Sequence, residues 1–158
     1  MADSNLDFLS TLPLFQELSL QEISILDQYL GLLELTAGDT VFDEGDNGEF
    51  VCFVVDGELE VSKKAFNGES SVITKLIKGQ TIGEMALIDK LPRSATVTAC
   101  SPSSLTVLSR RDFEELADQS PEIAIKILKY LARRLSLNLR KTSNQVSDRL
   151  ETDQPANA

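Results

Sequence analysis

The spacing of apolar residues divides the chain into a helical start, a long β-rich middle and a helical end. Between residues 5 and 18, apolar side chains recur at close intervals around Pro13, which predicts short helical turns packed on the body of the protein. Ser19-Leu20-Gln21-Glu22 has the form of a capping box, and near-helical spacing then continues to Gly31, where we expect the helix to end. The first helical segment is therefore predicted over 5–31.

Short apolar segments separated by Gly, Asp and Asn fill residues 32–109. The continuous apolar run 51–55 predicts a strand buried on both sides, whereas alternation over 58–62 predicts a strand with one wet face. Asp56-Gly57 and Asn67-Gly68 mark turns, and the second is a strong hairpin signal. So many short strands favour a mainly β sandwich or roll. Strands are predicted at 32–36, 40–43, 50–56, 58–64, 71–77, 95–99 and 105–108.

Helical patterns return over residues 110–150. Ser109 precedes one short helix, and Ser120-Pro121 supplies an N-cap followed by proline at the first position of a second, longer helix. An apolar stripe from Ile123 to Leu135 predicts that this longer helix packs on the domain. Residues 151–158 are polar and expected to fray. We therefore expect a single domain over 1–158, made of flanking helices around a β-roll at 32–109.

Composition narrows the class of protein. With 158 residues, 42% hydrophobic and 25% charged, the chain suits one globular domain. No run approaches the ~18 apolar residues of a membrane span, and the N-terminus lacks the features of a signal peptide, so we expect a cytoplasmic protein that does not contact membranes. Two cysteines, Cys52 and Cys100, are predicted to be buried free thiols.

Histidine is absent from the sequence. This removes most metal sites and the commonest general base, and it counts against a metal-dependent jelly-roll enzyme. No metal-binding or catalytic residue is therefore predicted, and we expect the protein not to be an enzyme.

The net charge of −10 is unevenly distributed. Residues 1–120 hold 8 Lys and Arg against 21 Asp and Glu, whereas residues 121–158 hold 7 against 4. An acidic body argues against nucleic acid as a partner, because phosphate contacts dominate that affinity. Salt screens the repulsion of a small anion within about 8 Å, so a local site with arginine and backbone donors can still bind one.

The stretch 79–99 carries the most chemistry. Gly83 permits a turn that a side chain would block, and the helix-forming residues 84–88 that follow present backbone N–H groups suited to a phosphate. Pro92 then fixes the chain ahead of Arg93, a charged fork shaped for phosphate oxygens. Glu84, nine residues before Arg93, can accept hydrogen bonds from sugar hydroxyls. Together these features indicate a nucleotide with a single exposed phosphate.

Gly83-Glu84-Met85-Ala86-Leu87 and Pro92-Arg93-Ser94-Ala95-Thr96-Val97-Thr98-Ala99 resemble the phosphate-binding cassette of the cyclic nucleotide-binding domain family, found in bacterial catabolite activators and kinase regulatory subunits. The resemblance covers nearly the whole chain, because turns at Gly38, Gly45 and Gly57 fall where the family has them. It implies an antiparallel, jelly-roll-like β-roll with N-terminal helices and a long C-terminal helix.

The resemblance also implies roles for individual residues. Arg93 and Ser94 would bind the phosphate, and Glu84 the ribose; a serine at position 94 tilts the expected ligand toward cyclic AMP, with cyclic GMP as the alternative. The other cassette residues would contribute through their backbone groups and small size. Three strand residues would form an apolar wall against the base, although packing in the core explains their apolar character equally well. Asn138 would reach the adenine amine, or is a solvated helix position. The remaining residues predicted for the site are Gly83, Met85, Ala86, Ala95, Val61, Ile73 and Leu76.

The predicted function is a ligand-sensing regulatory module without a cofactor. Movement of the C-terminal helix would signal to a separate effector protein, because too few residues follow that helix for a helix-turn-helix. The alternative is a protein-interaction module that kept the fold but lost nucleotide binding, suggested by the cationic helix 121–150 beside an acidic body. Hydrolysis of the nucleotide lacks an evident base. Whether the chain forms a homodimer is left open. A heptad-like spacing relates Leu135, Leu139, Thr142 and Val146, which could pair with a second helix or instead cover the chain's own domain.

Overall fold

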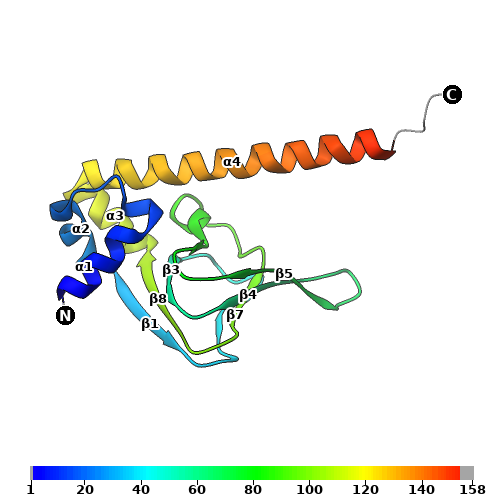
Figure 1. The fold of residues 1–158 in the computed structure, drawn as a ribbon, viewed down its shortest axis with the longest axis horizontal. Helices are drawn as coiled ribbons and strands as arrows, with labels where there is room; N and C mark the ends of the chain where they lie inside the picture. The colour runs from blue at the N-terminus through cyan, green and yellow to red at the C-terminus, as the bar shows by residue number, and fades with distance from the viewer. Residues whose placement is uncertain (1, 154–158) are drawn as a thin grey trace.

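The computed structural model of the chain describes residues 2–153 (Figure 1). It begins with α1 (Ala2–Thr11), a short 3₁₀ turn η1 (Pro13–Phe15) and α2 (Leu20–Asp27). The predicted capping box is confirmed: Glu22 N–H donates to Ser19 Oγ at 3.2 Å, and Ser19 N–H donates to Glu22 Oε1 at 3.0 Å. The predicted end at Gly31 is wrong, because α2 stops at Asp27 and Gly31 is already the first residue of a strand.

Eight strands form two four-stranded antiparallel sheets, which confirms the predicted β-roll. One sheet has the order β1-β8-β3-β6 and the other β2-β7-β4-β5. The bounds of each strand agree with those of a predicted strand to within two residues. The exception is β6, which was not predicted because its two residues are too few to show an alternation of apolar and polar side chains. The strands are β1 (Gly31–Leu35), β2 (Thr40–Phe42), β3 (Phe50–Asp56), β4 (Leu59–Lys64), β5 (Ser70–Leu76), β6 (Thr81–Ile82), β7 (Thr96–Ala99) and β8 (Ser103–Ser109).

Strand β3 is the centre of the packing. Its residues 51–54 are all buried, as the continuous apolar run predicted, because alternate side chains enter two different clusters. Val51 and Phe53 pack with the helices, whereas Cys52 and Val54 pack inside the roll. Both cysteines are free, but the prediction that both are buried is wrong for Cys100, which is exposed at the bend after β7.

Two helices close the structure. Ser109 caps α3 (Arg110–Gln119) by accepting from Asp112 N–H at 3.0 Å, as predicted. The long helix α4 (Pro121–Asp153) follows, and its first three turns supply Ile123, Ile127 and Leu131 to the core. Among the described side chains of α4 beyond Leu131, none is buried. The helix therefore has a packed start, and its described remainder is solvated; Figure 1 shows it extending beyond the body of the domain. The polar tail predicted over 151–158 begins too early, because α4 continues to Asp153. Residues 154–158 lie outside the described part of the chain.

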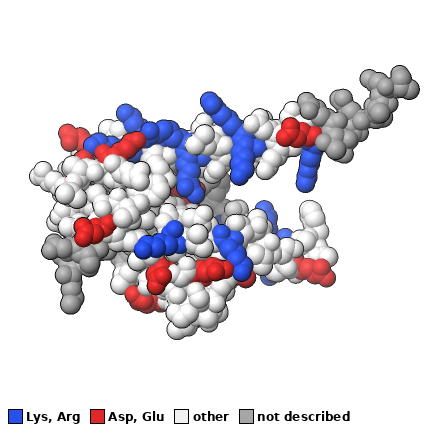
Figure 2. All heavy atoms as spheres, in the orientation of Figure 1, with Lys and Arg blue, Asp and Glu red and all other residues white. Residues whose placement is uncertain are grey.

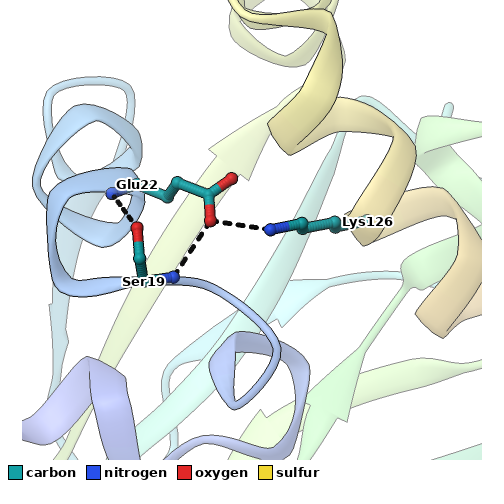
Figure 3. Close-up of polar contacts among 3 residues, drawn as sticks. All are labelled: Ser19, Glu22 and Lys126. Atoms are coloured by element: carbon teal, nitrogen blue, oxygen red, sulfur yellow. Dashed lines mark hydrogen bonds and ion pairs between the residues drawn. The ribbon is translucent and has the colours of Figure 1, made fainter.

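Charged side chains attach α4 to the N-terminal helices. Lys126 Nζ lies 2.7 Å from Glu22 Oε1, the carboxylate that also closes the capping box (Figure 3). Arg133 Nη2 lies 2.7 Å from Glu17 Oε1, in the segment between η1 and α2. Lys and Arg side chains gather along α4 (Figure 2), as expected from the sequence. No helix within residues 2–153 is long and apolar enough to cross a bilayer.

The ion pair between Glu22 and Lys126 predicts a pH-dependent contribution to stability. Hydrogen bonding to Lys126 and to the Ser19 backbone lowers the pKa of Glu22 below its usual 4.5. The pair therefore stabilises the fold above pH 4.5, and its contribution is lost as the pH falls through the lower folded-state pKa. Both side chains are partly exposed, so we expect Lys126→Met to reduce the free energy of unfolding by only about 0.5–1 kcal/mol at pH 7.

Urea unfolding of the wild type and Lys126→Met at several pH values measures this difference. We expect the difference to shrink as the pH falls below 4.5 and Glu22 becomes protonated. Lys129→Met removes an exposed lysine three positions further along α4 and should leave stability unchanged. A difference that stays constant between pH 7 and pH 3 would assign the effect to packing of the lysine stem rather than to the ion pair.

Candidate functional site

A cavity of about 380 Å³ opens between the roll and the segment that follows β6. Its volume lies within the range of ~300–1,000 Å³ typical of small-molecule sites. Most of the residues predicted for the site line it: Val61, Gly83, Glu84, Met85, Ala86, Arg93, Ser94 and Ala95. The sequence did not single out the rest of the wall as ligand contacts: Phe42, Gly48, Ile82, Asp89, Leu91, Pro92 and Val97.

Three predicted residues do not line this cavity. Ile73 is exposed on the edge strand β5, and Leu76, at the end of that strand, packs against the cluster inside the roll. Asn138 is exposed on α4, and its carbonyl accepts the Thr142 hydroxyl at 3.0 Å. Their contacts with a ligand stay predictions, and the structure brings none of the three to the cassette.

Gly83 sets the shape of the cassette. It directly follows β6 and is the N-cap of the 3₁₀ turn η2 (Glu84–Leu87). Its φ of 76° lies in the left-handed region that disfavours a side chain. A Cβ at this position would lie 2.2 Å from the Nη1 atom of Arg93. The glycine is thus needed both for the turn and for the close approach of the arginine.

Backbone hydrogen bonds hold the arginine segment against the turn at Gly45. Arg93 N–H donates to the Asp46 carbonyl at 2.7 Å, and Gly45 N–H donates to the Arg93 carbonyl at 2.9 Å. Pro92 forms a β-bridge with Asn47. This short antiparallel pairing fixes the position from which the Arg93 side chain enters the cavity wall.

Arg93 is only 7% exposed, and its guanidinium group is held from several sides. It lies over the rings of Phe42 and Phe50, with the Cζ atom 4.0 and 4.8 Å from the two centroids. It donates to the carbonyls of Gly83 at 3.3 Å and Phe50 at 2.5 Å. The cassette and β3 therefore hold this side chain in one orientation.

Arg93 keeps N–H donors that are available to bind an anion. Two of its five N–H donors reach carbonyls, and the buried Nε has no hydrogen-bond partner among the described residues. None of the ion pairs found within the described part of the chain involves Arg93. Burial lowers the pKa of the guanidinium because desolvation disfavours its charge, although arginine stays protonated. An anion in the cavity would compensate that charge.

Glu84, on the first position of η2, lines the same cavity and its side chain is 14% exposed. Its Oε1 atom lies 3.6 Å from the Nε atom of Arg134 on α4. Arg134 was not among the residues predicted for the site. Fifty residues separate it from the cassette, and its place in the predicted helix is one that a solvated arginine would also occupy. The cassette thus combines a cation and a carboxylate, and the carboxylate is already in contact with the long helix.

The model of the family described as "Cyclic nucleotide-binding domain" matches residues 32–120. The chain belongs to this family. It is 27% identical over 149 residues to the CRP-like cAMP-activated global transcriptional regulator of Mycobacterium tuberculosis, covering 94% of this chain and 65% of the relative. It is 37% identical over 109 residues to the cAMP-dependent protein kinase regulatory subunit of Yarrowia lipolytica, covering 69% of this chain and 28% of the relative.

A solved cyclic nucleotide-binding domain from Methylobacillus flagellatus matches the fold with a TM-score of 0.81, at 28% identity, over 94% of this chain and 85% of that one. The shared architecture includes the two antiparallel sheets, the flanking helices and the long C-terminal helix. The resemblance seen in the cassette is therefore confirmed, and the chain is a cyclic nucleotide-binding domain of the kind found in regulatory proteins. It spans about two thirds of the bacterial regulator's length and much less of the kinase subunit.

Proposed function

We propose that this domain is a sensor for cyclic AMP. The observation that carries the proposal is the cavity in which Arg93, buried and given no ionic partner by residues 2–153, faces the same space as the Glu84 carboxylate. The arginine suits the single negative charge of a cyclic phosphate, and the carboxylate suits the one free ribose hydroxyl. Ser94 and Ala95 beside the arginine would complete the phosphate contacts.

The choice of cyclic AMP over cyclic GMP is supported by Ser94 and by two relatives whose names state cyclic AMP activation or dependence. The base would rest on the apolar part of the cavity wall, to which Val61 and Val97 contribute. No cofactor enters the proposal. We also propose that the domain is not an enzyme, since the cassette offers binding groups and the two relatives described above are regulators.

Signalling would pass through α4 to a separate effector protein in the cytoplasm. The solvated part of α4 beyond Leu131 supports this route, because a segment without buried side chains can change its position at low cost. A ligand can shift that position only by as much as it binds the two arrangements differently. Transcriptional regulation, which the name of one relative states, is not part of the proposal, since this chain covers 65% of that relative.

A second candidate is a protein-interaction module without a nucleotide. The observation that favours it is the exposed apolar series along α4, in which Leu139 is 72% exposed and Val146 and Leu150 are also exposed. The same stretch of α4 carries Arg140, Lys141 and Arg149, and Figure 2 shows Lys and Arg side chains gathered along this helix. The same series could pair with a second copy of the helix, so a homodimer stays a prediction.

Calorimetric titration of the wild-type protein with cyclic AMP, cyclic GMP, 5′-AMP and adenosine tests the proposal. We expect cyclic AMP to bind at least about 10-fold more tightly than cyclic GMP, and at least about 100-fold more tightly than adenosine, which lacks the phosphate that Arg93 would bind. Cyclic AMP should remain unhydrolysed during the titration. Failure of all four ligands to bind would contradict the sensor function and favour the interaction module.

A further inference from the structure

We propose that Arg110 is a positioning residue for the phosphate site: it joins the two segments that hold Arg93, so that the affinity for a cyclic nucleotide depends on it. The inference rests on the proposed function and deepens it, because it concerns how the guanidinium group of Arg93 is kept in place. Arg110 is not part of the wall of the cassette cavity. It would therefore act through Arg93 rather than by touching the ligand.

Two segments that are far apart in the sequence support Arg93. One runs through the turn after β2 into the start of β3: its Asp46 carbonyl accepts Arg93 N–H at 2.7 Å, and its Phe50 carbonyl accepts the guanidinium group at 2.5 Å. The other is the cassette loop, residues 88–92, which leads directly to Arg93. The position of the guanidinium group thus depends on how these two segments are held relative to each other.

The cassette loop has little packing of its own. Ile88 is 52% exposed and Leu91 is 66% exposed. Asp89 N–H donates to the Met85 carbonyl at 2.9 Å, and Leu91 N–H donates to Asp89 Oδ1 at 3.1 Å, but both bonds stay within the cassette. Among the hydrogen bonds found within residues 2–153, a single one joins positions 88–91 to a segment outside the cassette, and its donor is Arg110.

Arg110 contacts both supporting segments at once. Its Nη1 atom donates to the Asp89 carbonyl at 3.0 Å, and its backbone N–H donates to the Glu49 carbonyl at 2.7 Å. Asp89 lies four residues before Arg93, and Glu49 directly precedes Phe50, whose carbonyl binds the guanidinium group. The main chain of one residue therefore holds one support of Arg93, while its side chain holds the other.

The helix that carries Arg110 is itself firmly placed. Arg110 is the first residue of α3, directly after the N-cap Ser109, and its side chain is half-buried. Phe113 and Leu116 of the same helix are buried in the cluster formed with the N-terminal helices and the start of α4. The beginning of α3 lies beside the cassette turn η2 (Figure 1). A rigid element thus fixes the cassette loop, as precise positioning of a binding group requires.

The charge of Arg110 acts on the same site. Burial is the main cause that lowers the pKa of Arg93, and the positive charge of Arg110 lowers it further. A bound anion would reduce the repulsion between the two cations, so Arg110 also raises the positive potential that attracts a phosphate. The neighbouring Arg111 is exposed, and no hydrogen bond or ion pair of its side chain is found within residues 2–153. It provides a matched control.

Calorimetry with cyclic AMP tests the proposal in the wild type, Arg110→Met, Arg110→Lys and Arg111→Met. We expect Arg110→Met to bind about 10-fold more weakly, because the cassette loop loses its bond to α3 and Arg93 is no longer held at the right place. Arg110→Lys keeps the charge and a donor for the Asp89 carbonyl, and should come within about 3-fold of the wild type. Arg111→Met should bind like the wild type.

Two further measurements distinguish positioning from a general loss of stability. In an Arg93→Ala background, Arg110→Met should cause no additional loss of affinity, because the group that it positions is already absent. Hydrogen exchange in the protein without nucleotide reports on the loop directly. The Arg93 amide, which donates to Asp46, should exchange about 10-fold faster in Arg110→Met and at the wild-type rate in Arg111→Met.

The outcomes separate this proposal from the proposed function. A wild type that binds no cyclic nucleotide overturns the proposed function and, with it, the dependence of affinity on Arg110. If the wild type binds cyclic AMP and a folded Arg110→Met binds it equally tightly, the sensor stands and the role of Arg110 is wrong. Equal losses with and without Arg93, or unchanged exchange of the Arg93 amide, would also overturn it. Arg110→Gln, which loses the charge but keeps a shorter N–H donor, replaces Arg110→Met if thermal unfolding shows that the latter does not fold.

Discussion

Replacement of Arg93 by alanine is expected to weaken cyclic AMP binding by about 3–4 kcal/mol, which is roughly 100- to 1,000-fold. The side chain is buried, held in one orientation by two rings and two carbonyls, and free of any ion pair found in the described part of the chain. Its loss would leave a bound phosphate in a partly desolvated cavity without a counter-charge. Isothermal titration calorimetry measures the difference.

Loss of this arginine also removes packing, so the variant needs controls. Arg111→Ala makes the same change of charge on an exposed position of α3 and should bind cyclic AMP like the wild type. Arg93→Lys keeps the charge but not the planar fork and should recover only part of the affinity. If Arg93→Ala melts like a folded protein and binds cyclic AMP as tightly as the wild type, the assignment of the phosphate site is wrong.

Gly83→Ala is expected to disrupt the site while leaving the protein folded. A Cβ at Gly83 would lie 2.2 Å from Arg93 Nη1, so the guanidinium must move out of its position between Phe42 and Phe50. The nearest atom is the end of a side chain, which limits the cost to the fold, although the Phe50 carbonyl oxygen, 3.3 Å from the added Cβ, must also shift slightly. We expect nucleotide affinity to fall by about 10- to 100-fold, or 1.4–2.8 kcal/mol, because the phosphate-binding group is displaced.

Gly79→Ala is the matched control for this variant. Gly79 also has a positive φ, of 91°, but a Cβ there would have no neighbour within 4 Å. Both variants should lose about 1–2 kcal/mol of stability from the strained backbone, measured by chemical unfolding. Only Gly83→Ala should lose affinity. Equal affinities for the two variants would show that the glycine serves the turn alone and that Arg93 tolerates displacement.

Local signals in the sequence were sufficient for most of the secondary structure. The capping box at Ser19, the cap at Ser109 and the continuous apolar run of β3 depend on residues within a few positions of one another, and all three predictions are confirmed. The end of α2 was misplaced because glycine at position 31 was taken as a helix terminator, whereas pairing with β8 places it in a strand. A non-local partner decided that boundary, and no local pattern reports it.

For the candidate site too, the residues predicted correctly lie close together in the sequence, and the others lie far from them. Glycine, proline, carboxylate and guanidinium at fixed spacing between residues 83 and 93 determined the chemistry of the cassette, because that chemistry is contained in one short segment. Ile73, Leu76 and Asn138 lie in segments remote from it, and sequence spacing could not show that none of them lines the cavity.

The sequence by itself therefore determined the family, the order of the elements and the residue types that would meet a cyclic nucleotide. The tertiary structure decided what surrounds them. Phe42 and Phe50 enclose Arg93 because β2 and β3 belong to facing sheets, and Arg134 meets Glu84 because α4 crosses the roll at that point. Contacts between residues forty to fifty positions apart depend on how sheets and helices pack, and packing is a property of the whole chain rather than of any segment.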